Sequence, residues 1–234
     1  MKVEIANPIY EVVFKYMMED KAVAKILVSS IIGEDIISLE PKPQEYIVEK
    51  TTTEGSTLTV YRLDFSAKIK TPDGHKLVII EMQKASFPAD IMRFRNHQER
   101  NLTAYTIYLL DDALGSCNTP VLKISSRLID METQEVIEGK CDFFESLYPP
   151  IWIVDFSCIQ KPHRNELELL LSVFDQNNRT TDHHILNVCE EDFPEKYRPL
   201  IRRLKQAAVT PEVKEQMRNE DEAMRLKLQQ AGLL

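Results

Sequence analysis

The alternation of apolar and polar residues in 61–70 constrains the fold of this chain more than any other feature. Apolar side chains occupy the odd positions of this segment and polar side chains the even positions, as in a half-buried β-strand. The next segment, 71–75, reads TPDGH, in which Asp73-Gly74 is a strong signal for a two-residue hairpin loop. Segment 76–84 (KLVIIEMQK) then predicts the returning strand. The sequence therefore predicts a long antiparallel β-hairpin.

The pairing of the two predicted strands follows from the position of this loop. With Asp73-Gly74 as the loop, Phe65 faces Met82, and the apolar sides of the two strands coincide. A shift by one residue would set apolar side chains against polar ones at every pair. The hydrophobic pattern therefore supports this register.

The polar face of the predicted hairpin gathers three oxygen-bearing side chains. In this register Asp64 is opposite Gln83, and Glu81 is the diagonal neighbour of Asp64. Two carboxylates and an amide oxygen at separations of about 5 to 8 Å can share a hard divalent cation such as Mg²⁺. Asp64 and Glu81 lie within otherwise apolar strands, where a buried charge requires a counter-ion. Spacing alone leaves a second interpretation open, in which this face is merely solvated.

The remaining chain predicts several helices and shorter strands. A first helix begins at Asn7-Pro8 with Asn7 as its N-cap, and a second runs from the capping Asp20 to Gly33. A longer helix is predicted over 91–114, after the hairpin. Further strands are expected at 121–129 and 151–157 with a hairpin arm near 135–137, and further helices at 166–174 and 195–208. Thr210-Pro211-Glu212 is expected to cap a last, highly charged helix that ends near Gly232.

Two histidines are adjacent in the sequence, His183 and His184. Neighbouring residues of a helix point about 100° apart and those of a strand point to opposite faces, so such a pair rarely chelates one metal. We expect both histidines in a surface loop.

The composition of the 234-residue chain is that of a globular protein, with 43% hydrophobic and 28% charged residues. No stretch approaches the roughly 20 apolar residues of a membrane span, so we expect no membrane association. The N-terminus lacks the apolar core of a signal peptide and the four cysteines are widely spaced, which favours reduced thiols and a cytoplasmic location. The net charge of −8 argues against nonspecific coating of nucleic acid, but permits an enzyme that contacts a few phosphates.

The order of the hairpin motif resembles that of a known enzyme superfamily. Asp64, a hairpin and then 81–83 (EMQ) resemble the PD-(D/E)XK nucleases, and within them the recombination-promoting nuclease and transposase-like branch. Segment 11–15 (EVVFK) is similar to the opening of that branch, the helix expected around 93–108 matches its arrangement, and 150–156 (PIWIVDF) resembles its later strand. The resemblance covers residues 7–115 well and the remainder loosely.

The resemblance implies an α/β fold with a restriction-endonuclease-like core. In such a core a mixed β-sheet is flanked by helices, and here a C-terminal helical extension would follow. The implied organisation is a nuclease-like domain over 1–208 and a charged C-terminal helix over 209–234. The implied activity is that of a Mg²⁺- or Mn²⁺-dependent DNA endonuclease linked to transposition or recombination, and cutting of both strands would suit a homodimer.

The resemblance also implies roles for individual residues. Asp64 and Glu81 would hold the metal ion, and Gln83 would position the attacking water. Glu11 would contact a second metal ion or its water, although it also fits an ordinary exposed helix acid. Three arginines are expected to contact DNA phosphates, namely Arg93, Arg95 and Arg100. Each of them also fits an ordinary solvated surface residue.

The motif departs from the superfamily pattern at two positions. Leu63 replaces the proline, and Gln83 replaces the lysine that orients water and stabilises the transition state. The neighbouring Lys84 points to the opposite face of a strand and cannot take over directly. An alternative is therefore a catalytically inactive nuclease-fold protein that binds nucleic acid or another protein.

Overall fold

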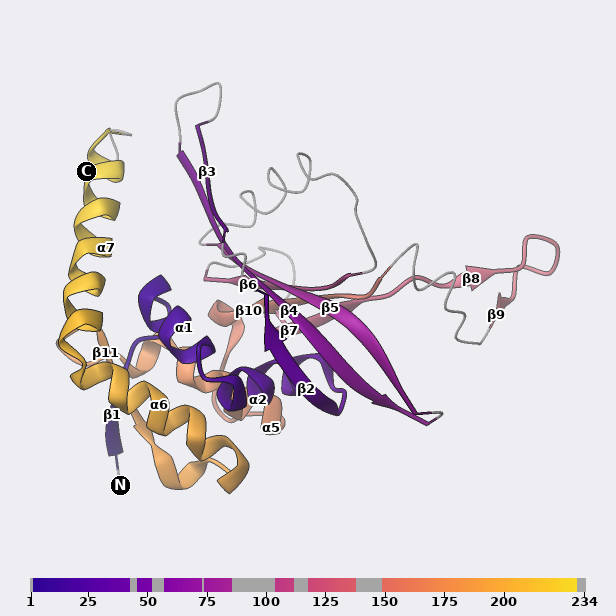
Figure 1. Cartoon of the computed structure of the whole chain (residues 1–234), viewed down its shortest axis with the longest axis horizontal. Coiled ribbons are helices and arrows are strands. Elements are labelled where there is room, and N and C mark those ends of the chain that lie inside the picture. The colour runs from indigo at the N-terminus through magenta and orange to yellow at the C-terminus, as the bar shows by residue number, and fades with distance from the viewer. Residues whose placement is uncertain are drawn as a thin grey trace. The chain divides into compact units, whose positions relative to one another are not determined.

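The computed structural model describes residues 2–42, 46–51, 57–72, 74–85, 104–111, 118–137 and 149–230 of a mixed α/β chain (Figure 1). Its contacts divide the chain into two compact units. Unit 1 combines Met1–Gly33, Lys50–Thr57 and Phe156–Leu234, and unit 2 comprises Glu34–Glu49 and Leu58–Asp155.

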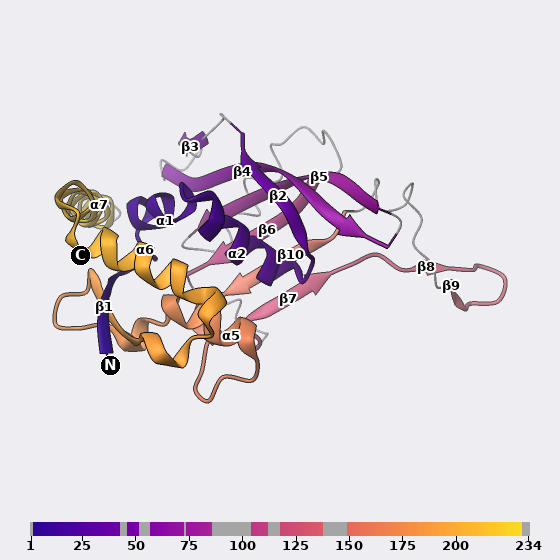
Figure 2. The same cartoon turned by 60° about the horizontal axis from the view of Figure 1, so that its bottom comes forward.

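A mixed β-sheet forms the framework of unit 2, as the sequence predicts. Its strands lie in the order β2, β4, β5, β6, β10, β7, and β3 also pairs with β4 (Figure 2). Strand β6 is parallel to β5 and β10, and the other pairs along this order are antiparallel. The strands span Ile36–Pro41 (β2), Tyr46–Thr51 (β3), Thr57–Thr71 (β4), Gly74–Ala85 (β5), Ala104–Leu110 (β6), Val121–Ile124 (β7) and Ile151–Asp155 (β10). A separate pair, β8 (Leu128–Ile129) with β9 (Val136–Ile137), forms the expected hairpin arm.

One face of the sheet carries buried apolar side chains from neighbouring strands. Phe65, Ile80, Ile107 and Val154 come from neighbouring strands and are fully or almost fully buried. The alternating pattern of β4 places its apolar residues on this face and leaves the polar residues on the other. The expectation of a half-buried strand is thus confirmed for β4.

The predicted hairpin is present, but its predicted register is wrong by two positions. Thr71 pairs with Gly74, so Gly74 belongs to the returning strand and not to the loop. Pro72 suits the first loop position because its ring fixes φ near −65°, and Gly74 has a φ of 132°, which L side chains rarely adopt. A shift by two residues keeps each side chain on its face, so the separation into apolar and polar faces survives.

The predicted helix over 91–114 is wrong in its second half, because 104–110 is strand β6. This segment reads AYTIYLL, which is rich in β-branched and aromatic residues. Pairing with parallel strands on both sides buries Tyr105, Ile107, Leu109 and Leu110. Continuous burial of this kind is typical of a central parallel strand, whose sequence is not distinguishable from that of a buried helix by periodicity alone.

Helices predominate in unit 1. They are α1 (Glu11–Met18), α2 (Lys21–Ile32), α5 (Glu166–Leu171), α6 (Arg198–Val209) and α7 (Pro211–Gln230), with short 3₁₀ turns at Phe156–Cys158, Ser172–Phe174, Gln176–Asn178, Glu190–Asp192 and Glu195–Tyr197. Helix α1 contacts α2, α6 and α7, and α6 packs on β1 (Lys2–Ala6), which pairs antiparallel with β11 (Ile185–Cys189). Phe174 is fully buried among these elements. Its ring is stacked on that of Phe156 with 4.1 Å between ring centroids, and the centroid of the Phe14 ring lies 6.4 Å away.

The ends of α2 are confirmed, whereas the start of α1 is not where the sequence predicts. The Asp20 carboxylate accepts hydrogen bonds from the backbone N–H groups of Ala22 and Val23, and Gly33 ends the helix with a φ of 71°. Helix α1 begins at Glu11, not at Pro8. Asn7 is buried, and its side chain bonds to Gln176 and to the His183 carbonyl. Its Oδ1 accepts a bond from the N–H of Ile9, so it caps the turn that precedes α1 rather than the helix itself.

Helix α7 confirms the predicted C-terminal helical extension. Its first half packs against the other helices through Val213 and Met217, which are buried. Its second half leaves Met224 and Leu226 about half exposed, at 48% and 58%. Among the described residues no helix has both the length and the apolar character that a membrane span requires.

Candidate functional site

Asp64 and Glu81 are direct partners in the antiparallel pair of β4 and β5. Asp64 lies near the middle of β4 and is only 8% exposed, and its carbonyl accepts a hydrogen bond of 2.8 Å from the N–H of Lys42. The same row continues across the sheet to Thr106 of β6 and Ile151 of β10. Directly opposed residues share one face of a sheet, so positions 64 and 81 lie together on the polar face.

The two-residue correction of the register exchanges the positions of Glu81 and Gln83 relative to Asp64. Gln83 pairs with Arg62 in β4 and with Tyr108 in β6, so it is diagonal to Asp64 rather than opposite it. Glu81, expected on the diagonal, is the direct partner. The three predicted site positions therefore remain on one face, and the two carboxylate-bearing positions are closer than the sequence predicts.

This arrangement of positions suits a hard divalent cation. Cβ atoms of directly opposed residues lie about 4.5 to 5.5 Å apart, a separation at which two carboxylates can bind one ion. Oxygen ligands of this kind are those that Mg²⁺ and Mn²⁺ prefer. The burial of Asp64 adds to the fit, because a buried carboxylate gains from a nearby positive charge.

Lys84 lies on the opposite face and forms a buried ion pair with Asp111, which directly follows β6. Its Nζ is 2.9 Å from Asp111 Oδ2, and the two side chains are 9% and 13% exposed. Burial raises the pKa of Asp111, and the ammonium group of Lys84 opposes this shift. The other carboxylate oxygen, Oδ1, is buried and has no hydrogen-bond partner in the part of the chain that the structure describes. The side chain of the lysine adjacent to the motif thus lies on the opposite face, as strand alternation requires, and its partner there is Asp111.

Of the remaining predicted site residues, Glu11 belongs to the other compact unit and three arginines are not described. Arg93, Arg95 and Arg100 lie outside the described residues. Glu11 is the first residue of α1 and belongs to unit 1, whereas Asp64 and Glu81 belong to unit 2. Its backbone N–H donates to Glu220 of α7 at 2.9 Å, and it lines a groove of about 360 Å³ between α1 and α7.

A second cluster, which the sequence does not predict, brings His183 and His184 together with Asp221 of α7. Each histidine has its Nε2 atom 2.8 Å from the same carboxylate oxygen, Asp221 Oδ2. The other oxygen, Oδ1, accepts a hydrogen bond of 2.9 Å from the Tyr10 hydroxyl. Burial raises the pKa of Tyr10, and the bond to Asp221 adds to the rise. Burial also acts to raise the pKa of Asp221, but the hydrogen bonds from His183, Tyr10 and His184 outweigh it and lower that pKa.

The two neighbouring histidine side chains converge, although in a helix or a strand they would point apart. The His183 and His184 ring centroids are only 4.4 Å apart, since both residues lie in a turn before β11. A turn is bound neither by the 100° step of a helix nor by the alternation of a strand, so consecutive side chains can converge. The pair is in a loop, as expected, and Asp221, 37 positions from His184, completes the cluster.

Comparison of the chain with protein-family models, with curated proteins and with solved structures finds no match.

Proposed function

We propose that this protein is a metal-dependent DNA endonuclease of the PD-(D/E)XK type, with a link to transposition or recombination. The observation that supports the proposal most is the direct pairing of Asp64 with Glu81 inside a mixed sheet. The motif order that the sequence predicts is preserved, and its two acidic positions lie on one face. The proposal includes a cytoplasmic location, a restriction-endonuclease-like core and assembly as a homodimer that cuts both strands.

In this proposal the predicted site residues have separate roles in the reaction. Asp64 and Glu81 would hold Mg²⁺ or Mn²⁺, which when bound polarises the scissile phosphate and lowers the pKa of water. The carbonyl group of Gln83 would orient the attacking water by accepting its hydrogen bond. Glu11 would act at a second metal ion, and Arg93, Arg95 and Arg100 would contact phosphates.

A second candidate is a nuclease-fold protein that binds nucleic acid or another protein without cutting. It is favoured by the position of the neighbouring lysine. Lys84 is ion-paired with Asp111 on the opposite face, so it does not supply the charge that Gln83 lacks. The net charge of −8 also favours a partner other than bulk DNA.

Plasmid nicking in Mg²⁺ and in Mn²⁺ tests the proposal. We expect the wild-type chain to nick supercoiled DNA, and Asp64→Ala and Glu81→Ala to reduce nicking to the level seen with EDTA. Asp35→Ala is the matched control, because it removes a carboxylate that is 72% exposed and belongs to the same unit. Nicking that survives both site substitutions would reject the site. DNA retention by the wild-type chain without nicking would favour the second candidate.

A further inference from the structure

The His183–His184–Asp221 cluster has the donor set of a transition-metal site. Its three ligand atoms lie within 4.8 Å of one another, and they are two imidazole nitrogens and one carboxylate oxygen. On a tetrahedral Zn²⁺ with bonds of about 2.0 to 2.1 Å, ligand atoms are roughly 3.3 Å apart. The two nitrogen–oxygen distances of 2.8 Å therefore need to open by about half an ångström, and the two nitrogens, at most 4.8 Å apart, need to lie at a similar separation of roughly 3.3 Å.

The groups around the cluster already orient its ligands. His184 Nδ1 lies 2.9 Å from the Asp182 carboxylate, which is the arrangement in which an outer carboxylate fixes a metal-binding histidine. When Nδ1 donates to Asp182, Nε2 either carries a second proton or offers its lone pair to a cation. Tyr10 donates to the remaining oxygen of Asp221 and so fixes the carboxylate in the same way.

The backbone that carries the histidines is also held in place. The N–H group of Asn7 donates to the His184 carbonyl at 2.8 Å, and the Asn7 side chain donates to the His183 carbonyl at 2.9 Å. Asn7 itself is 1% exposed. Both histidines therefore start from a turn anchored in the buried part of unit 1, which lowers the entropic cost of binding an ion.

We propose that His183, His184 and Asp221 bind a divalent transition-metal ion of the Zn²⁺ class. Imidazole ligands suit Zn²⁺, Co²⁺ and Ni²⁺, whereas Mg²⁺ prefers oxygen ligands and retains its waters. The site is thus chemically distinct from the oxygen-rich face at Asp64 and is independent of the proposed nuclease activity. His183 is 56% exposed and Asp221 is 38% exposed, which gives an ion access from solvent and leaves room for a water ligand.

The bound ion would join α7 to the turn before β11. Two ligands come from that turn and the third from α7, whose second half has few buried side chains. Binding to the folded state alone raises thermal stability in proportion to the logarithm of ion concentration. Zinc therefore stabilises the folded chain and secures its C-terminal helix in this proposal.

Metal titration of the full chain, after removal of metals with EDTA, tests the site. We expect calorimetry to show one equivalent of Zn²⁺ bound, and Co²⁺ to develop the visible absorption of a low-coordinate site. His184→Ala and Asp221→Asn should each weaken Zn²⁺ binding by at least about 100-fold, and Asp182→Asn by about 10- to 100-fold. The matched control is His75→Ala, which removes an exposed histidine of unit 2 and should bind Zn²⁺ as the wild type does.

Two results would overturn the proposal. The first is a wild-type chain that takes up no Zn²⁺ or Co²⁺ at pH 7.5, which would leave the cluster as a hydrogen-bonded group only. The second is tight binding that His184→Ala and Asp221→Asn leave unchanged. Circular dichroism in EDTA verifies that each variant is folded. If one is not, His183→Gln and Asp182→Asn carry the same test, because both replace exposed or outer groups.

Discussion

Asp64 of β4 and Glu81 of β5 occupy directly opposed positions in one antiparallel pair. Their proximity depends on the loop at Pro72, because the length of the loop sets which residues of the two strands meet. A register shifted by one residue would place the two positions on opposite faces. The candidate oxygen site is thus a consequence of hairpin register.

For the proposed nuclease, a lysine at position 83, as in the superfamily that the motif resembles, is expected to increase activity. Gln83 lies diagonal to Asp64 on the polar face, so Gln83→Lys would add a positive charge where negative charge develops during phosphodiester hydrolysis. We expect the Mg²⁺-dependent nicking rate to rise by about 10-fold or more. Gln83→Glu is the control and should not raise the rate. Equal rates for the lysine variant and the wild type would argue against a role of position 83 in the reaction.

Breaking the buried ion pair is expected to cost more than removing it altogether. Asp111→Leu removes the carboxylate that pairs with the buried ammonium group of Lys84 and should lower the free energy of unfolding by about 3 to 5 kcal/mol. The double variant Lys84→Met/Asp111→Leu removes both charges and should recover most of this loss. Urea unfolding of Asp111→Leu, Lys84→Met and the double variant measures the free energy of unfolding of each. If the losses of free energy of unfolding in the two single variants add up to the loss in the double variant, the pairing is contradicted.

The N-cap of α2 should contribute measurably to stability. Asp20 accepts two backbone hydrogen bonds, at 2.9 Å from Ala22 and 3.2 Å from Val23. Asp20→Ala removes both and should reduce the free energy of unfolding by about 1 kcal/mol, whereas Asp20→Asn should retain most of it. Urea unfolding midpoints, with an unchanged dependence on urea, provide the comparison. Equal losses in both variants would show that the side-chain oxygen is not what matters.

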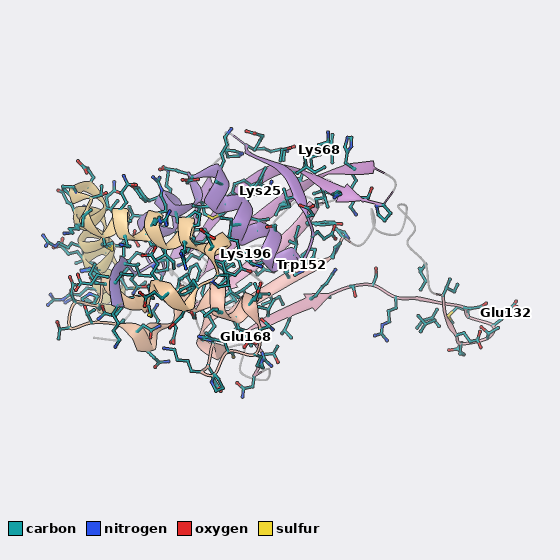
Figure 3. All side chains as sticks on the ribbon, turned by 90° about the horizontal axis from the view of Figure 1, so that it is seen from below. Lys25, Lys68, Glu132, Trp152, Glu168 and Lys196 are labelled. Atoms are coloured by element: carbon teal, nitrogen blue, oxygen red, sulfur yellow. The ribbon has the colours of Figure 1, made fainter. Side chains whose placement is uncertain are left out.

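Acidification should weaken the start of α5 through Glu168, which Figure 3 labels and which is 5% exposed. Burial acts to raise the pKa of Glu168, but hydrogen bonds from the side chain and the backbone of Arg164 outweigh it and lower that pKa below the usual 4.5. A lowered pKa in the folded state stabilises the fold above pH 4.5, and this stabilisation is lost as the pH falls through the lowered value.

Glu168→Gln should therefore be less stable than the wild type at pH 7 and should lose less stability on acidification. Melting temperatures of the two chains between pH 7 and pH 3 test this expectation. Parallel pH profiles for the wild type and the variant would contradict it.

Local signals predicted most of the elements that local physics controls. The alternation in β4 and the cap at Asp20 depend on side chains and backbone a few residues apart, and both are present. The same holds for Pro211 at the start of α7. The two-residue error in the hairpin arose because both Asp73-Gly74 and Pro72-Asp73 are good loop pairs, and the apolar pattern cannot separate registers that differ by two.

Errors arose where distant partners decide the structure. Strand β6 is held by parallel neighbours on both sides, and such a buried strand has no alternating pattern. Strand β1 was not predicted because its partner β11 lies at the other end of the chain, with Val3 paired to Val188. Asn7 likewise binds Gln176 and His183 instead of capping α1.

The sequence by itself determined the long hairpin and which of its residues share a face, because strand periodicity depends only on neighbouring residues. It therefore also determined that Asp64 and Glu81 would lie on one side of a sheet. Only the tertiary structure decided that Asp221 meets His183 and His184, and that Lys84 is paired with Asp111. These contacts join residues far apart in the chain, and packing of whole elements, not local preference, brings their side chains together.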